Sequence, residues 1–282
     1  MEKELHNILF EERNLLCEPI PSDYELSLQQ GVYSFLSSSF KPHLQSYLQV
    51  FEQWRADTNA DAITRDQLKN LPFTLNNSLW RARRKDFEIV ERILSGKEAL
   101  TILETGSWNG WLSNQLSRLG HKVVAIDYFG DDLDGLQARK HYPQAKWTSI
   151  QMDLEDIHHL QPIFDVVLFN RNLAHSPGIE PTLQKAKELL KPNGLVLATG
   201  LNIVYDSSAI DQHFKASEAY FSKQGISFYL KENIKKYLCP DDMPIIKNQG
   251  FQLHPYPQRL LGKVKSHFKA NPSKAFWAIY ES

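Results

Sequence analysis

The sequence has few cysteines, no long apolar run and almost no net charge, and each shortage excludes a class of protein. Its only cysteines, Cys17 and Cys239, lie far apart, which excludes a disulfide framework, leaves a single bridge open and fits the reducing cytoplasm. No run of about eighteen apolar residues occurs, and the charged N-terminus lacks the apolar core of a signal peptide. A net charge of −1 gives no field that would attract nucleic acid. We expect a globular, cytoplasmic protein without a membrane segment.

One stretch, Thr101 to Asp127, organises the rest of the chain. An apolar, β-branched run ends at Glu104, and a turn continues from there to Gly110. Leucines then recur at helical spacing, which predicts a strand, a tight loop and a helix. Lys122 to Ile126 indicates a second strand that ends on Asp127, where nucleotide-binding α/β units place an acid for ribose hydroxyls. The pattern therefore predicts a ligand with an adenosine-type ribose.

The missing glycines decide between ligands. A dinucleotide fingerprint requires three glycines in this loop, so that the backbone can approach the pyrophosphate and the helix can pack on the strand. The corresponding positions here are Gly106, Trp108 and Trp111. A bulky indole at the second position argues against a pyrophosphate. S-adenosylmethionine has no phosphate and requires a less close approach.

The spacing of Glu104, Gly106 and Gly110 resembles the first motif of class I S-adenosylmethionine-dependent methyltransferases. Many members have a further glycine where this chain has Trp108, but O-methyltransferases of the catechol and caffeoyl-CoA type often have an aromatic residue there. Some other α/β protein with a strand, turn and helix is the alternative. Three more strand segments follow at intervals typical of βαβ units, at 147–152, 164–169 and 195–199, with a helix expected to end near Pro143 and a turn at 192–194. The resemblance thus extends over about residues 101–200 and points to the small-molecule, type 11/12-like branch.

This resemblance implies a Rossmann-like α/β fold with a mostly parallel, seven-stranded sheet and an antiparallel C-terminal strand. Residues 96–282 would form the domain that binds S-adenosylmethionine. Asp153 and Leu154 would bracket the adenine, although an acid after a strand could equally cap a helix. The residues implied in cofactor binding by their positions after the strands are Glu104, Gly106, Ser107, Trp108, Gly110, Asp127, Tyr128, Asp153, Leu154, Asn170 and Arg171.

Residues 1–95 are expected to form an N-terminal extension that is mainly helical and could act as a lid. Its first part is similar to the zinc ribbon that precedes some methyltransferase domains, but Ile20 replaces the second cysteine. We expect either a degenerate segment without metal or no relation to the ribbon. A helix is predicted from His43 to about Asp57, and another from an N-cap at Ser78 to Gly96. The basic first turns of that second helix are either a solvated surface or a cofactor contact.

By resemblance, the helix ahead of the first motif covers the cofactor. Arg84, or failing that Arg81, would pair with the methionine carboxylate, and Trp80 would cover the acceptor pocket. Asn172 and His175 would contact the acceptor, and His175 is either a general base or a structural residue. Metal-dependent catechol-type enzymes have acids where this chain has Asn170 and Asn202, so we expect no metal.

Three classes of function stay open: a small-molecule methyltransferase, an RNA- or protein-modifying methyltransferase, and a non-catalytic relative that keeps the fold. Neutral overall charge favours a small-molecule partner over nucleic acid, and the basic stretch at 259–274 resembles an ordinary exposed loop. The sequence identifies neither the acceptor nor the oligomeric state.

Overall fold

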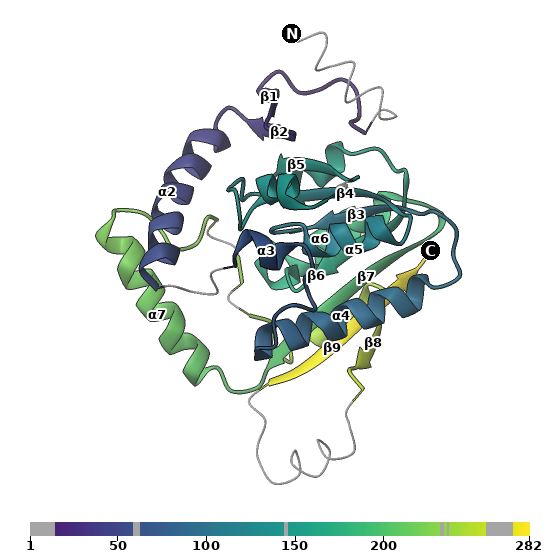
Figure 1. Cartoon of the computed structure of the whole chain (residues 1–282). Coiled ribbons are helices and arrows are strands. Elements are labelled where there is room, and N and C mark those ends of the chain that lie inside the picture. The colour runs from purple at the N-terminus through teal and green to yellow at the C-terminus, as the bar shows by residue number, and fades with distance from the viewer. Residues whose placement is uncertain (1–14, 59–62, 144–145, 232–233, 236, 258–272) are drawn as a thin grey trace.

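A computed structural model describes residues 15–58, 63–143, 146–231, 234–235, 237–257 and 273–282 (Figure 1). Most of the basic stretch at 259–274 lies outside these residues. The nine strands within the described residues form one sheet in the order β1-β2-β5-β4-β3-β6-β7-β9-β8. The strands are β1 (Tyr24–Gln29), β2 (Val32–Ser37), β3 (Thr101–Thr105), β4 (Lys122–Asp127), β5 (Thr148–Met152), β6 (Phe164–Asn170), β7 (Leu190–Val204), β8 (Gln252–Pro255) and β9 (Ser273–Glu281).

Strands β5, β4, β3, β6 and β7 are parallel neighbours, and β9 is antiparallel to both β7 and β8. This confirms the predicted α/β fold and its antiparallel C-terminal strand. The central strands are buried on both faces, as their continuous apolar sequences require. β7 is longer than predicted, and the turn expected at 192–194 is an irregularity in the register between β6 and β7, which resumes at Val166 and Leu195.

The hairpin β1–β2 extends the predicted seven-stranded sheet to nine strands. β2 pairs in parallel with β5, through Val32 with Ser149 up to Phe35 with Met152. Val32 and Phe35 are buried in this position. The first segment of the N-terminal extension is therefore part of the main sheet in this structure, and both cysteines are free thiols.

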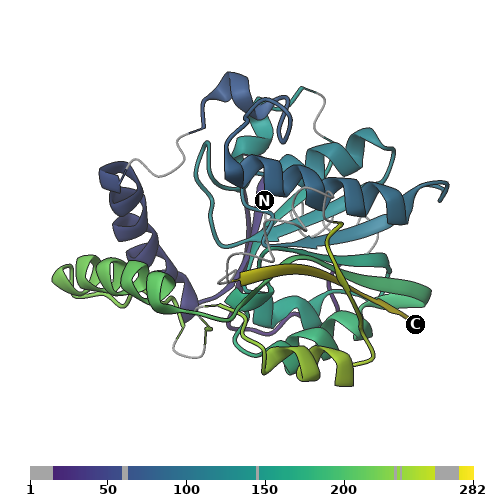
Figure 2. The ribbon, with the colours of Figure 1, turned by 90° about the horizontal axis from the view of Figure 1, so that it is seen from below.

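Helices cover both faces of the sheet (Figure 2): α4 and α5 lie on one face, and α6 and α8 on the other. α2 and α7 lie side by side beyond the sheet in both views and meet through aromatic rings such as Tyr47 and Phe221. Among the described helices, none is long and apolar enough to cross a membrane. The α-helices are α2 (Phe40–Thr58), α3 (Arg65–Leu68), α4 (Ser78–Leu94), α5 (Trp111–Arg118), α6 (Ile179–Glu188), α7 (Ser208–Lys223) and α8 (Asp242–Asn248).

Two local predictions need correction. The N-cap of α4 is Asn77, whose side-chain oxygen accepts a hydrogen bond from the Trp80 amide at 2.9 Å, and Ser78 is the first helical residue. The helix expected to end near Pro143 is only a short 3₁₀ helix, η1 (Leu136–His141). The other short 3₁₀ segments are η2 (Leu154–His159) and η3 (Leu173–His175).

Candidate active site

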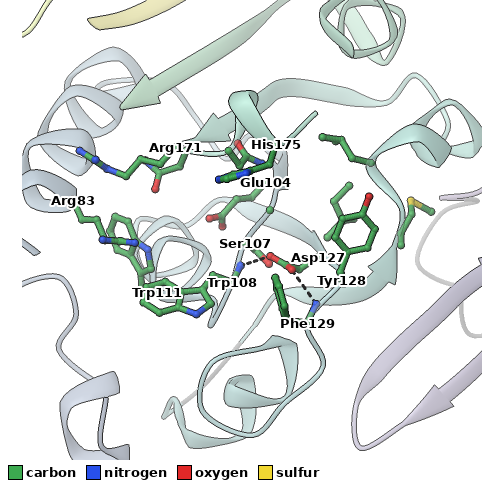
Figure 3. A pocket seen from close by; sticks show the side chains of 16 residues that line it. Arg83, Glu104, Ser107, Trp108, Trp111, Asp127, Tyr128, Phe129, Arg171 and His175 are labelled. Atoms are coloured by element: carbon green, nitrogen blue, oxygen red, sulfur yellow. Dashed lines mark hydrogen bonds between the residues drawn. The ribbon is translucent and has the colours of Figure 1, made fainter. Parts of the chain in front are cut away.

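A cavity of about 240 Å³ opens at the carboxyl ends of β3, β4 and β6 (Figure 3), where α/β sheets bind their ligands. It brings together most of the residues that the sequence placed at a cofactor or acceptor site. Those lining it are Glu104, Gly106, Ser107, Trp108, Asp127, Tyr128, Leu154, Asn170, Arg171, Asn172 and His175. Arg83, Trp111, Ile126, Phe129 and Met152 complete the wall.

Gly106 and Gly110 shape the loop between β3 and α5 in different ways. Gly106 has a φ of 57°, and an added Cβ would lie 2.3 Å from the Asn172 amide nitrogen. That nitrogen donates a hydrogen bond to the Thr105 carbonyl at 2.7 Å, so Asn172 is held against the loop. Gly110 has a φ of 72° and caps α5 without lining the cavity; a Cβ there would lie 2.9 Å from the Trp147 ring. Both positions thus require glycine.

Asp127 organises the loop by accepting backbone hydrogen bonds. Its two carboxylate oxygens accept from the Trp108 amide at 2.6 Å and the Phe129 amide at 3.0 Å, as Figure 3 shows. The side chain is 8% exposed. Burial raises the pKa of this carboxyl to about 6, and the backbone hydrogen bonds oppose that rise. Each oxygen keeps a second lone pair with which it can accept from a ligand hydroxyl.

Glu104 lies at the end of β3, beside His175 in Figure 3. It is 1% exposed, and the Ser113 hydroxyl donates a hydrogen bond to it. Burial raises the pKa of Glu104 to about 8, because the ionised form loses its hydration. The carboxyl group therefore carries a proton at neutral pH.

The arginine of α4 that reaches the cavity is Arg83, which replaces the expected Arg84 and Arg81. Its guanidinium carbon lies 5.0 Å from the Trp80 ring centre and 4.9 Å from that of Trp108. Arg81 and Arg84 line a different groove, where they donate to the backbone carbonyls of Asn76 and Phe73.

Two further expected contacts are not formed at the cavity. Trp80 is fully buried and stacks on Trp108, with ring centres 5.7 Å apart, so its indole supports the wall from behind. Asp153 is 4% exposed and lies outside the lining. Its carboxylate accepts from the Tyr128 hydroxyl at 2.7 Å and pairs with Lys231, while the adjacent Leu154 does line the cavity.

Arg171 is fixed by a buried network that joins four elements. Its guanidinium donates to both oxygens of Asp86, a fully buried residue of α4, at 2.5 and 3.3 Å. The Tyr256 hydroxyl also donates to Asp86, at 2.6 Å, and accepts from the Gly200 amide at 2.8 Å. Arg171 has a positive φ of 62°, and Gly200 leaves room for its side chain because a Cβ would lie 2.3 Å from Arg171 Cγ. The sequence placed Arg171 at the cavity but did not indicate Asp86 or Tyr256.

His175 ends η3, and its ring faces the cavity near Glu104 (Figure 3). The ring keeps an accessible surface, while the surrounding protein atoms lower the pKa of the imidazole by desolvation. The neutral form therefore predominates at pH 7, and neutral imidazole can accept a proton. Asn170, the last residue of β6, also lines the cavity and donates to the Thr199 hydroxyl at 2.8 Å.

Possible metal ligands of the described residues gather elsewhere. Asp156, His158 and His159 place ligand atoms within 4.8 Å of one another on η2, and none of the three lines the cavity. The Asp156 carboxylate already accepts from the Tyr24 hydroxyl at 2.8 Å. This cluster gives the cavity no metal ligand.

The chemistry of the cavity fits S-adenosylmethionine. Two of the lining residues, Ser107 and Asn172, each carry a side-chain oxygen that is buried without a hydrogen-bond partner among the described residues. Such atoms are costly unless a ligand satisfies them. Asp127 supplies an acceptor for hydroxyl groups, and Arg83 supplies a cation. The strand order and this cavity define the class, a Rossmann-like class I S-adenosylmethionine-dependent methyltransferase.

Comparison with known proteins gives the family. The methyltransferase-domain family matches residues 96–266, more than half of the chain, and the chain belongs to this family. A ubiquinone biosynthesis O-methyltransferase of Paramagnetospirillum magneticum is 34% identical over 40% of this chain and 45% of its own length. One of Bradyrhizobium diazoefficiens is 24% identical over 62% of this chain and 70% of its own. The chain thus spans about half the length of the first of these relatives.

A solved structure resembles the fold. Phosphoethanolamine N-methyltransferase 2 of Haemonchus contortus, solved in complex with S-adenosylmethionine, aligns with a TM-score of 0.51 and 14% identity. The alignment covers 80% of this chain and 59% of that one. At this identity the likeness describes the fold alone.

Proposed function

We propose that this protein transfers a methyl group from S-adenosylmethionine to a hydroxyl oxygen of a small molecule. The observation that carries the proposal is the cavity itself: Asp127 at the end of β4, the unsatisfied Ser107 and Asn172 groups, and His175 lie around one small space. The relatives named as O-methyltransferases favour a hydroxyl acceptor.

In this proposal, bound S-adenosylmethionine supplies a methyl group activated by its sulfonium. The Asp127 carboxylate accepts hydrogen bonds from the ribose hydroxyls and is oriented by the Trp108 and Phe129 amides. Arg83 binds the methionine carboxylate. These contacts fix the ligand, and methyl transfer depends mainly on such orientation and on the exclusion of water.

His175 is the base in the proposed reaction. Its lowered pKa keeps the imidazole neutral at pH 7, so that a ring nitrogen can take the proton of the acceptor hydroxyl. The protonated Glu104 beside it adds no negative charge to that part of the cavity at neutral pH.

Calorimetry with S-adenosylmethionine tests the cofactor assignment. Asp127→Ala should weaken binding roughly tenfold or more, which matches the loss of charge-assisted hydrogen bonds. Asp206→Asn, which changes an exposed acid outside the cavity, should leave the affinity within about twofold. Equal affinities in all three proteins would overturn the placement of the cofactor.

Methyl transfer itself is tested with radiolabelled S-adenosylmethionine and a panel of phenols, catechols and aliphatic alcohols. Product formed by the unaltered protein and lost in His175→Gln, with cofactor affinity retained, would support the proposal. Transfer to RNA or protein alone, or cofactor binding without transfer to any acceptor class, would contradict it and favour one of the other functions.

A further inference from the structure

A second hollow lies beside the cavity, along the solvent side of α4, and we refer to it as the basic groove. It has a volume of about 760 Å³. Its cationic side chains share one helical stripe of α4, joined by Arg171 from the loop after β6. The lining residues are Ser78, Arg81, Ala82, Arg84, Lys85, Glu88, Ile89, Arg92, Arg171, Tyr256, Pro257 and Ala275.

Of the five cations that line the basic groove, only Arg171 is paired with an acid among the described residues, the buried Asp86. Arg81 and Arg84 donate to the neutral carbonyls of Asn76 and Phe73. Within the described part of the chain, Arg81, Arg84, Lys85 and Arg92 form no ion pair, and Glu88 is the one acid among the lining residues. Since the whole chain has a net charge of −1, this excess of positive charge is local. Clustered arginine and lysine side chains of this kind bind carboxylates and phosphates.

Arg171 connects the basic groove to the cofactor cavity, because it lines both. Its side chain is held by Asp86 and is 26% exposed. The Asp86 contacts use two of the five guanidinium N–H groups, which leaves others for a ligand. A ligand that lies in the groove against Arg171 therefore contacts a residue that also lines the cavity.

We propose that the basic groove binds an oxyanionic group of the methyl acceptor, a phosphate or a carboxylate, while the acceptor's reacting hydroxyl lies on the cavity side of Arg171. This inference rests on the proposed function, since it specifies the acceptor of that reaction. A net charge of −1 gives the chain no global field for a nucleic acid, which favours a small molecule.

Three small aromatic probes test this: phenyl phosphate, benzoate and uncharged phenol, titrated into the full chain by calorimetry at low salt. The test variant is Arg81→Gln with Lys85→Gln, two exposed residues one helical turn apart. The matched control is Lys69→Gln with Arg118→Gln, which removes two charges from another surface groove. Thermal unfolding confirms that both variants fold.

We expect one molecule of phenyl phosphate or benzoate to bind, with affinity at least tenfold lower in the test variant and within about twofold in the control. The tighter of the two anions identifies the group as phosphate or carboxylate. Equal losses in both variants, or equal binding of phenol, would overturn the inference. An RNA oligonucleotide that binds far more tightly than either anion and is lost in the test variant would also overturn it, in favour of a nucleic-acid substrate.

The same variants separate this inference from the proposed function. S-adenosylmethionine affinity should be unchanged in the test variant, because Arg81 and Lys85 do not line the cofactor cavity. If the anions bind the groove and S-adenosylmethionine does not bind at all, the proposed function fails while the groove stands. If the cofactor binds and the anions do not, only the groove assignment fails.

Discussion

Asp86 and Arg171 form a bidentate ion pair although they lie 85 positions apart in the sequence. The pair fastens the middle of α4 to the loop that follows β6. Because Asp86 is fully buried, its charge depends on Arg171 and on the Tyr256 hydroxyl for compensation. The wall between the cofactor cavity and the basic groove is thereby rigidly attached to both α4 and the end of β8.

We expect Asp86→Asn to destabilise the protein strongly. The substitution leaves the Arg171 guanidinium without its counter-charge, and breaking a buried pair from one side typically costs about 3–5 kcal/mol. Urea unfolding measures the loss. Glu98→Gln, at an exposed position, should change stability by less than about 0.5 kcal/mol. A similar small change in both variants would show that the pair does not hold the wall.

Gly106 should tolerate alanine less well than another glycine with positive φ. Gly96 has a φ of 75° and nothing within 4 Å of an added Cβ, so Gly96→Ala isolates the backbone penalty of about 1 kcal/mol. Gly106→Ala adds a clash with the Asn172 side chain and should lose more stability, together with S-adenosylmethionine affinity. Asn172→Ala in the same chain should restore part of the stability. Equal losses for the two glycines in thermal unfolding would contradict the close approach.

The raised pKa of Glu104 predicts that the stability of the protein falls as the pH rises above neutral. Its pKa rises from 4.5 to about 8 on folding, so between these values the folded protein keeps a proton that the unfolded chain has lost. Stability therefore falls as the pH rises through this window and levels off above it. Glu104→Gln has no proton to lose. Between pH 6 and 8.5 the unaltered protein should drop in Tm by roughly 5 °C more than this variant.

Asp127 contributes little between pH 6 and 8.5. Its pKa is about 6, so its effect on stability falls mostly below pH 6. Glu98→Gln, an exposed glutamate, should follow the unaltered protein. If the Tm values of Glu104→Gln and of the unaltered protein fall equally as the pH rises, Glu104 is ionised throughout and the prediction of a raised pKa is wrong.

The sequence located those cavity residues that lie at the carboxyl end of a strand. Glu104, Asp127 and Asn170 were located because the carboxyl ends of parallel strands meet at one edge of a sheet. The pairing of β2 with β5 was not predictable in this way, because their partner residues, such as Phe35 and Met152, are distant in the chain. The position of Asp153 outside the cavity lining was not predictable for a similar reason. Tyr128 and Lys231, which bind its carboxylate, come from other segments of the chain.

Arg83 was predictable from helical spacing. Phe87, Val90 and Leu94 of α4 are buried, and Arg83 precedes them by four, seven and eleven positions, a spacing that places it on the same side of the helix. Arg81 and Arg84 belong to a different stripe, which lines the basic groove together with Glu88 and Arg92. The basic first turns of α4 therefore contain one arginine that lines the cavity and others that line the basic groove. Composition alone does not distinguish them.

The last prediction concerns this arginine. The Arg83 guanidinium lies over the rings of Trp80 and Trp108 at the cavity wall, which orients its planar fork. A carboxylate matches that fork in two parallel hydrogen bonds, which a lysine ammonium does not reproduce. Arg83→Lys should therefore weaken S-adenosylmethionine binding by roughly tenfold, about 1.4 kcal/mol. Adenosine, which has no carboxylate, should bind the variant and the unaltered protein within about twofold of each other.

Arg84→Lys is the matched control, one position along the same helix but outside the cavity lining. It should leave the affinities for both ligands within about twofold, because Arg84 donates to the Phe73 carbonyl on the groove side. Calorimetry with the two ligands and the two variants gives four affinities. Equal losses for S-adenosylmethionine and adenosine in Arg83→Lys would mean that Arg83 supports the shape of the cavity through its tryptophan contacts. A loss of S-adenosylmethionine alone in Arg84→Lys would return the carboxylate contact to the arginine first expected from the sequence.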